Sequence, residues 1–270
     1  MSSSDFTDRG GVVHSATDAE RRRRIVSLVP SLTETLCEVG GRARLMGCTA
    51  FCIRPKDVLK DPSVIKVGGT KTVKRERVMA LNPDLLLVNL EENELADIDF
   101  FKARVECYVN GVKTVAEGIH SIREVAMLIG TPDKAEEFAG RAELALAKLI
   151  QQSKDKTPRR LFYPIWKDPW MSINRDTFIH DHLRLCGAEN IFGGAPERYP
   201  VITLEQVRAA NPEIVWLPSE PFVFKQKHAP ELAALLPNAR IELVDGDNVC
   251  WFGTRQIEGM EYTGRQMQVS

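Results

Sequence analysis

The 270-residue sequence lacks several features that would decide its class at once. It has no apolar run near the roughly 20 residues that a membrane-spanning helix needs, and its polar start holds no apolar core of a signal peptide. Its 36 lysines and arginines nearly cancel its 37 aspartates and glutamates, so nothing draws the chain as a whole to nucleic acid or an anionic membrane. We therefore expect a globular protein with a disordered tail over residues 1–23. We expect it to be cytoplasmic as given, and periplasmic only if the true N-terminus differs.

The six cysteines also lack a pattern. They form no CxxC pair and no compact disulfide framework, and without an export signal reduced thiols are the simplest account. Cys52 and Cys250 both fall in loops after predicted strands, where two thiols facing one site would suit a soft metal; ordinary packing is the favoured alternative. His180 and His182 stand two apart on a predicted helix and point away from each other. No metal site is predicted.

Short aliphatic runs alternate with amphipathic segments, the βαβ pattern of parallel sheets covered by helices. Strands are predicted at residues 25–29, 44–50, 84–89, 105–111, 160–165, 213–218 and 240–246. Helices are predicted at residues 31–39, 73–81, 116–130, 178–187, 204–210 and 231–236. The fold class is therefore α/β.

One further helix is longer than the rest. Residues 132–154 carry a helical stripe of apolar side chains after Thr131, a good N-cap, and Pro132, which suits a first helical position. Such a helix is roughly 35 Å long, enough to run from one lobe to another. We predict an N-terminal lobe over 24–130, a connecting helix over 131–155 and a C-terminal lobe over 156–270.

A repeat in register across the two halves supports two lobes of similar build. The segment from Glu76 through Asn-Pro-Asp to LLLVNLEEN matches the segment from Glu205 through Asn-Pro-Glu to IVWLPSEP. Glu91 and Glu220 fall at the same offset beyond the proline. Each half thus predicts a helix, an Asn-Pro stop, a buried strand and an acid just past its end.

Ligands of open parallel sheets bind outside the carboxyl ends of the strands, so the segments that follow predicted strands hold the candidate site. These segments collect aromatic rings, which suit a flat or macrocyclic organic ligand; the alternative is that some rings plug the ends of the sheets. His228, near Phe222 and Phe224, lines the site or starts a helix. Gly68–Lys71 is either a weak anion cradle or a plain turn. The candidate ligand-contacting residues are Phe51, Cys52, Arg54, Lys71, Glu91, Trp166, Trp170, Tyr199, Glu220, Cys250, Trp251 and Arg255.

The order and spacing of several motifs carry a resemblance to a known family. RIVSLVPSLTETL, VGGTK, ERVMALNPDLLLV, the long helix, GAENIF and EQVRAANPEIVWL together resemble the substrate-binding proteins of vitamin B12 and ferric-siderophore ABC importers. This is the helical-backbone metal receptor, or class III, family, and the resemblance covers Arg24 to about residue 266.

The resemblance implies two Rossmann-like lobes joined by one backbone helix, with little hinge motion. Its ligand would be a metal chelate, such as cobalamin, a haem-like compound or a ferric siderophore, held in the cleft between the lobes, with no intrinsic cofactor. It also implies that Glu76 and Glu205 meet arginines of a membrane permease; two solvated helix-surface glutamates are the alternative. A monomer is expected.

The sequence departs from the cobalamin binders of that family, which place a tryptophan at Thr70 and an acid at Cys250. The pocket is therefore expected to suit another ligand. Two other functions stay open at this point: a cytoplasmic sensor or ligand-handling protein of the same fold, and an enzyme that uses Glu91 and Glu220 as acid and base. No catalytic residue is assigned, since no nucleophile elbow, Walker loop or zinc-protease helix is present.

Overall fold

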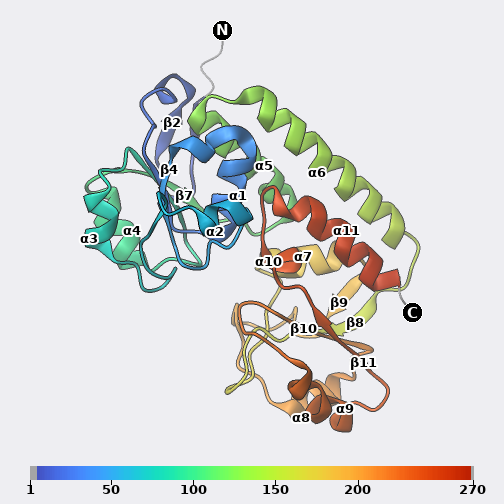
Figure 1. Cartoon of the computed structure of the whole chain (residues 1–270). Helices are drawn as coiled ribbons and strands as arrows, with labels where there is room; N and C mark the ends of the chain where they lie inside the picture. The colour runs from blue at the N-terminus through green and yellow to red at the C-terminus, as the bar shows by residue number, and fades with distance from the viewer. Residues whose placement is uncertain (1–4, 269–270) are drawn as a thin grey trace. The chain divides into compact units, whose positions relative to one another are not determined.

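The computed structural model describes residues 5–268, which form two compact units (Figure 1). The first unit comprises the residues up to Val112 together with Gly118–Ala142 and Phe252–Thr254. The second unit comprises Lys113–Glu117, Glu143–Trp251 and the residues from Arg255 onward. None of the helices within residues 5–268 is both long and apolar enough to cross a membrane.

The first unit is built on a five-stranded sheet in the order β5-β4-β3-β6-β7, and all neighbouring strands are parallel. Its strands are β3 (Ile25–Ser27), β4 (Leu45–Cys48), β5 (Ile65–Lys66), β6 (Leu85–Asn89) and β7 (Glu106–Asn110). Its helices are α1 (Pro30–Leu36), α2 (Lys56–Lys60), α3 (Arg75–Ala80), α4 (Leu95–Lys102) and most of α5 (Val115–Ile129). Every residue of β6 is buried, as expected of a central strand covered on both faces.

The second unit holds a four-stranded parallel sheet in the order β11-β10-β8-β9. Its strands are β8 (Arg159–Phe162), β9 (Ala188–Asn190), β10 (Ile214–Pro218) and β11 (Arg240–Val244). Its helices are α7 (Phe178–Leu185), α8 (Leu204–Ala210), α9 (Ala229–Leu235), α10 (Asp247–Cys250) and α11 (Arg255–Gln268). In both sheets the chain first winds to one side of its opening strand and then to the other, so each sheet has a topological switch point.

The long helix α6 (Pro132–Ser153) begins at the predicted proline and buries most of the predicted stripe, including Ala135, Phe138 and Ala142, whereas Ile150 near its end is 45% exposed. The division between the two units falls within it, after Ala142. The chain passes from one unit to the other within this helix (Figure 1), and it also crosses briefly around residues 113–117 and 252–254.

The sequence repeat corresponds to one hydrogen-bonded motif in each unit. Arg24, just before β3, donates through its guanidinium to the carbonyl of Leu81, and its amide donates to the Asp84 carboxylate at 2.9 Å. Arg160 in β8 donates in the same way to the carbonyl of Ala210, and its amide donates to the Glu213 carboxylate at 2.9 Å.

The asparagine of each Asn-Pro stop has the same left-handed backbone, with φ of 44° at both Asn82 and Asn211. Asparagine tolerates this conformation better than most residues. The helix therefore ends sharply, and the following strand starts beside the opening strand of its unit.

All seven strands predicted from the sequence are present, and the α/β fold class is confirmed. Strands β5 and β9 were not predicted, and they have only two and three residues. Strands this short give no hydrophobic period to detect.

The predicted disordered tail does not hold for residues 5–23. Asp5–Thr7 (β1) and Val13–Ser15 (β2) form an antiparallel hairpin, and residues 1–4 lie outside the described part of the chain. The hairpin contacts the outer edge of β7, where the Arg9 amide donates to the Val109 carbonyl at 3.0 Å. The Val109 amide in turn donates to the Asp8 carboxylate at 2.7 Å. The hairpin thereby covers backbone groups of β7 that an edge strand leaves unpaired.

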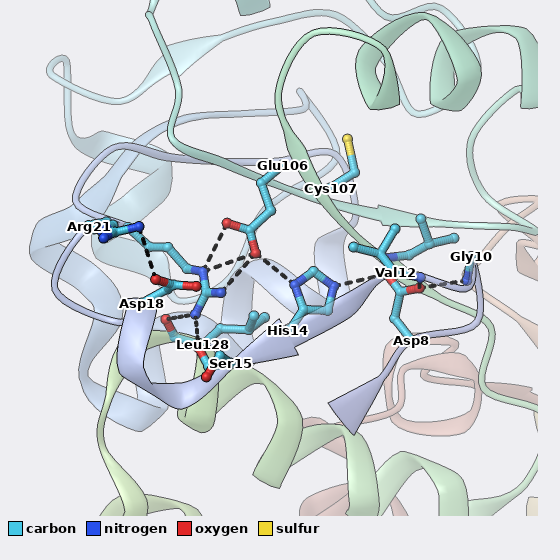
Figure 2. Close-up of polar contacts among 12 residues, drawn as sticks. Asp8, Gly10, Val12, His14, Ser15, Asp18, Arg21, Glu106, Cys107 and Leu128 are labelled. Carbon is cyan, nitrogen blue, oxygen red and sulfur yellow. Dashed lines mark hydrogen bonds and ion pairs between the residues drawn. The ribbon is translucent and has the colours of Figure 1, made fainter. Parts of the chain in front are cut away.

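Figure 2 shows what holds the hairpin: the buried His14 ring lies between the carboxylates of Asp8, at 3.0 Å, and Glu106, at 2.7 Å. Arg22, which is buried as well, pairs with Glu106 at 2.8 Å. Two positive and two negative groups therefore meet inside the unit. Glu106 stands 92 residues from His14, so the polar composition of residues 1–23 gives no sign of this partner.

These contacts shift the pKa values of all three titrating groups. Burial alone would lower the pKa of His14, but its hydrogen bonds to Asp8 and Glu106 raise it above 6.5. Burial alone would raise the pKa of both acids, but hydrogen bonds lower the pKa of Asp8 and bring that of Glu106 to about 2. The acids stabilise the hairpin above their unfolded pKa values, 3.8 and 4.5. His14 stabilises it fully below 6.5, and this contribution is lost as pH rises through its raised pKa.

We predict that His14→Ala speeds hydrogen exchange of the Val109 amide by about 100-fold at pH 6. Removing one partner of a buried ion pair costs about 3 kcal/mol, and 1.4 kcal/mol is about tenfold. Exchange corrected for its intrinsic pH dependence should be slowest between pH 4.5 and 6.5 in the unsubstituted protein. His120→Ala, which removes an exposed imidazole on α5, is the control. Equal Val109 exchange in the His14 variant and the control would contradict the role given to His14.

Candidate ligand site

The second unit has an aromatic cluster at the carboxyl ends of β8 and β10, on either side of its switch point. Trp166, after β8, meets Phe222, after β10, edge to face with ring centroids 5.3 Å apart. Phe222 contacts Phe224 at 4.7 Å and His228 at 5.7 Å. The two loops therefore present one continuous aromatic surface.

Backbone pairing fixes the loop that carries Trp166. The Ile165 amide donates to the Met171 carbonyl at 2.9 Å, and the Met171 amide donates to the Trp166 carbonyl at 3.1 Å. Trp170, in the same loop, is buried and stacks on Phe224 with an interplanar angle of 13°. Trp170 thus belongs to the core beneath the aromatic surface, in line with the alternative that some of these rings plug the end of the sheet. Trp166, by contrast, is 44% exposed.

A hollow of ≈ 380 Å³ opens beside this cluster. Its lining is Trp166, Pro221, Phe222, Val223, Lys225, Lys227 and His228. His228 Nδ1 accepts a hydrogen bond from the Lys225 amide, and desolvation together with Lys227 and Lys167 lowers its pKa. The hollow therefore offers aromatic walls, two ammonium groups and a neutral imidazole.

Glu220 and Trp251 meet beside the same switch point. The Trp251 indole donates to the Glu220 carboxylate at 3.0 Å, and Trp251 itself is buried. Gly246, after β11, allows the approach of this loop, because a Cβ there would stand 2.5 Å from the Glu220 amide nitrogen. Trp251 thus positions the Glu220 carboxylate rather than exposing its own ring.

In the first unit the loop after β6 is organised by two buried asparagines. Asn89 Oδ1 accepts from the amides of Glu91 and Glu92, and Asn93 Nδ2 donates to the carbonyls of Leu28 and Thr70, both at 3.1 Å. Asn93 therefore joins the segments that follow β3, β5 and β6. Glu91 was the predicted site residue of this loop and neither asparagine was predicted, because a single asparagine in a polar run gives no signal of its partners.

Glu92 is a second residue that the sequence analysis missed. Although part of the residue reaches solvent, desolvation of its carboxyl raises the pKa to about 7, against the opposing charge of Lys71. Lys71 also pairs with the Glu94 carboxylate at 3.4 Å. A carboxylic acid that titrates near neutral pH thus stands at the carboxyl end of the first sheet.

The twelve predicted ligand-contacting residues fall into three groups, and their role remains a prediction. Exposed to solvent are Phe51, Lys71, Trp166 and Tyr199; partly buried are Arg54, Glu91, Glu220 and Cys250; buried are Cys52, Trp170, Trp251 and Arg255. Arg255 pairs with Glu258 on its own helix. Cys52 contacts Thr33 and Thr49.

His182 is a structural residue. Its two ring nitrogens bond Val249 and Thr263, and burial lowers its pKa to about 4. Within residues 5–268 no group of three or more histidine, cysteine or acidic side chains is arranged to hold a metal ion.

The two glutamates of the repeat both lie in the first turn of their helices. Glu76 is exposed on α3 and Glu205 is exposed on α8. Each helix precedes its unit's Asn-Pro stop, so the two carboxylates hold equivalent places in the two units.

The profile of a protein family described as periplasmic binding protein matches residues 25–232. The chain belongs to the periplasmic binding protein family. This confirms the resemblance seen in the motifs. The vitamin B12-binding protein of Vibrio parahaemolyticus is 26% identical over 196 residues, covering 72% of this chain and 70% of the relative. That of Pectobacterium carotovorum is 25% identical over 202 residues, covering 74% and 72%.

Solved structures show the same fold. The periplasmic vitamin B12 binding protein of Vibrio cholerae superimposes with a TM-score of 0.79 at 21% identity, over 92% of this chain and 97% of that one. A periplasmic heme-binding protein from Roseiflexus sp. RS-1 gives 0.78 at 19% identity, over 91% and 99%.

The family corrects one expectation. The cytoplasmic location expected from the sequence is wrong, because the family is periplasmic. The error came from treating the polar residues 1–23 as evidence about the compartment. Residues 5–15 of this segment instead form the hairpin on β7.

We predict that Trp166→Phe removes most of the iodide-quenchable tryptophan fluorescence. Trp166 is 44% exposed, whereas Trp170, Trp216 and Trp251 are at most 8% exposed, and iodide quenches only rings that it can reach. Trp170→Phe is the control and should leave the quenchable fraction unchanged. An equal loss in both variants would show that the Trp166 loop does not stand open as described.

Proposed function

We propose that the protein binds a metal chelate carried on a large organic ring or scaffold, a corrinoid, a haem-like tetrapyrrole or a ferric siderophore, at the carboxyl ends of its strands. It then presents this ligand to an ABC importer. The Trp166–Phe222 pair beside the hollow carries the proposal, because aromatic walls with few polar groups suit a flat, macrocyclic ligand. The vitamin B12 and heme binding of its relatives supports the same ligand class.

We propose binding without catalysis. The Glu220 carboxylate accepts a hydrogen bond from a buried indole, an arrangement that orients an acid toward a ligand. The family is one of binding proteins, which supports the same conclusion. The metal of the chelate is cargo, and the chain is proposed to recognise the organic part of the ligand.

The ligand is identified by titrating the purified protein with cyanocobalamin, haem and a ferric siderophore, following tryptophan fluorescence and the visible spectrum of each ligand. One of the three should saturate the protein at about micromolar concentration or below. Trp166→Ala and Phe222→Ala should each weaken binding about tenfold, since an aromatic contact contributes about 1.5 kcal/mol beyond its buried area. Leu144→Ala, which changes an exposed side chain on α6, is the control. Failure of all three ligands to bind would refute the metal-chelate proposal.

We further propose that Glu76 and Glu205 dock the protein on the permease. Their exposure and equivalent places support this role, because a permease that receives two related units needs a matching anion on each. Glu76→Arg and Glu205→Arg should each weaken binding to a purified vitamin B12 importer in nanodiscs at least tenfold, since like charges across an interface cost several kcal/mol. Ligand affinity should stay unchanged. Glu261→Arg, an exposed acid on α11, is the control; equal binding by all three variants would contradict the docking role.

A further inference from the structure

Two cysteines of the first unit lie beside a lysine. Cys48 is the last residue of β4, and the parallel pairing of β4 with β5 places Lys66 opposite it. The Lys66 ammonium stands 3.1 Å from the Cys48 sulfur and 3.5 Å from the Cys52 carbonyl oxygen. A thiolate at Cys48 therefore has a cation within contact distance.

Cys52 is the second thiol of this group. A turn returns the chain, with the Cys52 amide donating to the Thr49 carbonyl at 3.2 Å, and the Cys52 thiol lies close enough to the Cys48 sulfur to alter its pKa. Its sulfur also lies 3.0 Å from the Thr33 hydroxyl and 3.2 Å from the Thr49 hydroxyl. Three residues separate Cys48 from Cys52, so the pair does not match the CxxC pattern and was not predicted from the sequence.

The two thiols differ in acidity. The hydrogen bond from Cys52, with the charge of Lys66, lowers the pKa of Cys48 to about 7 against the effect of burial. Burial raises the pKa of Cys52 well above 9.0. Arg42 also lowers the pKa of Cys48, and Cys37 lies near enough to interact with it. At neutral pH Cys48 is thus partly ionised while Cys52 keeps its proton, as in exchange-active dithiols.

We propose that Cys48 and Cys52 form a reversible thiol–disulfide exchange site for small disulfides. The Cys48 thiolate attacks one sulfur of the incoming disulfide and releases the other as a thiolate, which leaves a mixed disulfide on Cys48. Cys52 then attacks the Cys48 sulfur, its proton passes to the departing thiolate, and the Cys48–Cys52 disulfide forms. The small disulfide is the oxidant, and two molecules of its thiol are the reduced product.

The charge of Lys66 makes the site reversible rather than a permanent staple. An ammonium that stabilises the thiolate stabilises the reduced state, so the disulfide is more easily reduced than an ordinary structural one. The periplasmic setting of the family supplies disulfide-forming conditions.

The turn that carries Cys52 has several exposed residues. Ala50, Phe51 and Ile53 of that turn are exposed, Phe51 by 58%. Both sulfurs are buried, so the proposed reaction requires local opening of these residues to admit a small disulfide. Oxidation would also tie down the turn that carries Phe51, so the redox state of the pair constrains a predicted ligand contact.

Three other cysteines of the described chain offer a contrast. Burial raises the pKa of Cys37, Cys107 and Cys186 to about 12 in each case. Thiols of this kind hold their proton at neutral pH and react slowly. Cys48 is the thiol that the surrounding charges activate.

The test is incubation of the folded full chain with oxidised glutathione, followed by alkylation of free thiols and peptide mapping by mass spectrometry. We expect a Cys48–Cys52 disulfide that dithiothreitol reverses, and in Cys52→Ser a stable mixed disulfide on Cys48. Lys66→Met should slow the reaction about fivefold at pH 7, because a smaller fraction of Cys48 is then thiolate. The remaining thiolate is more basic and so a better nucleophile, but this offsets only part of the loss. The control, Cys107→Ser, should react like the unsubstituted protein.

Cys48 and Cys52 that both remain open to alkylation after incubation, or that cross-link only once the chain is unfolded, would overturn the proposal. So would a Lys66→Met protein that folds, by circular dichroism, and reacts as fast as the unsubstituted chain. None of these readouts depends on ligand binding, so the test stands or fails separately from the proposed function.

Discussion

The arginine that opens each sheet fixes the geometry on which both units depend. Arg24 and Arg160 each bind the last carbonyl before an Asn-Pro stop, and the acid after that stop binds the arginine's own amide. A helix end, a strand start and the opening strand are thereby joined at one point. Parallel pairing then follows with Ile25 opposite Leu85 in one unit and Leu161 opposite Ile214 in the other.

This motif lies at the amino ends of the strands and leaves their carboxyl ends free to differ. Register set at one end of a parallel pair determines where both strands finish. The loops after β6 and after β10 therefore emerge at equivalent places, whatever residues they carry. Fold and binding chemistry are separated along the same strands, which is the usual division in open α/β sheets.

The repeat explains why so much of the fold was predictable. Seven strands carry dense aliphatic runs, and the Asn-Pro stops act through local backbone chemistry, so both are visible in a few consecutive residues. The hairpin over β7 was not predictable, because it depends on Glu106 meeting His14 across 92 residues. Taken one by one, the residues of the hairpin have the composition of a polar, disordered tail.

The candidate site was predictable only as a set of loops. Trp166 is exposed and Trp170 is buried although both lie in one short loop, because the backbone of Ile165 pairs with that of Met171. The residue types of the loop do not indicate this pairing. Likewise Asn93 acts by reaching two carbonyls from other segments. Residue type indicates which chemistry a loop can perform, whereas long-range hydrogen bonds decide which side chain performs it.

The two carboxyl ends, built on one motif, carry opposite chemistry. The first unit presents acids and amides held by Asn89 and Asn93, and the second presents aromatic rings and lysines around the hollow. The first end can accept hydrogen bonds from a donor, whereas the second can cover an apolar face and donate to an acceptor. Agreement of the repeat at the amino ends of the strands fixes the fold of each unit. Divergence of the repeat at these loops, rather than its agreement elsewhere, therefore sets the chemistry that each unit offers.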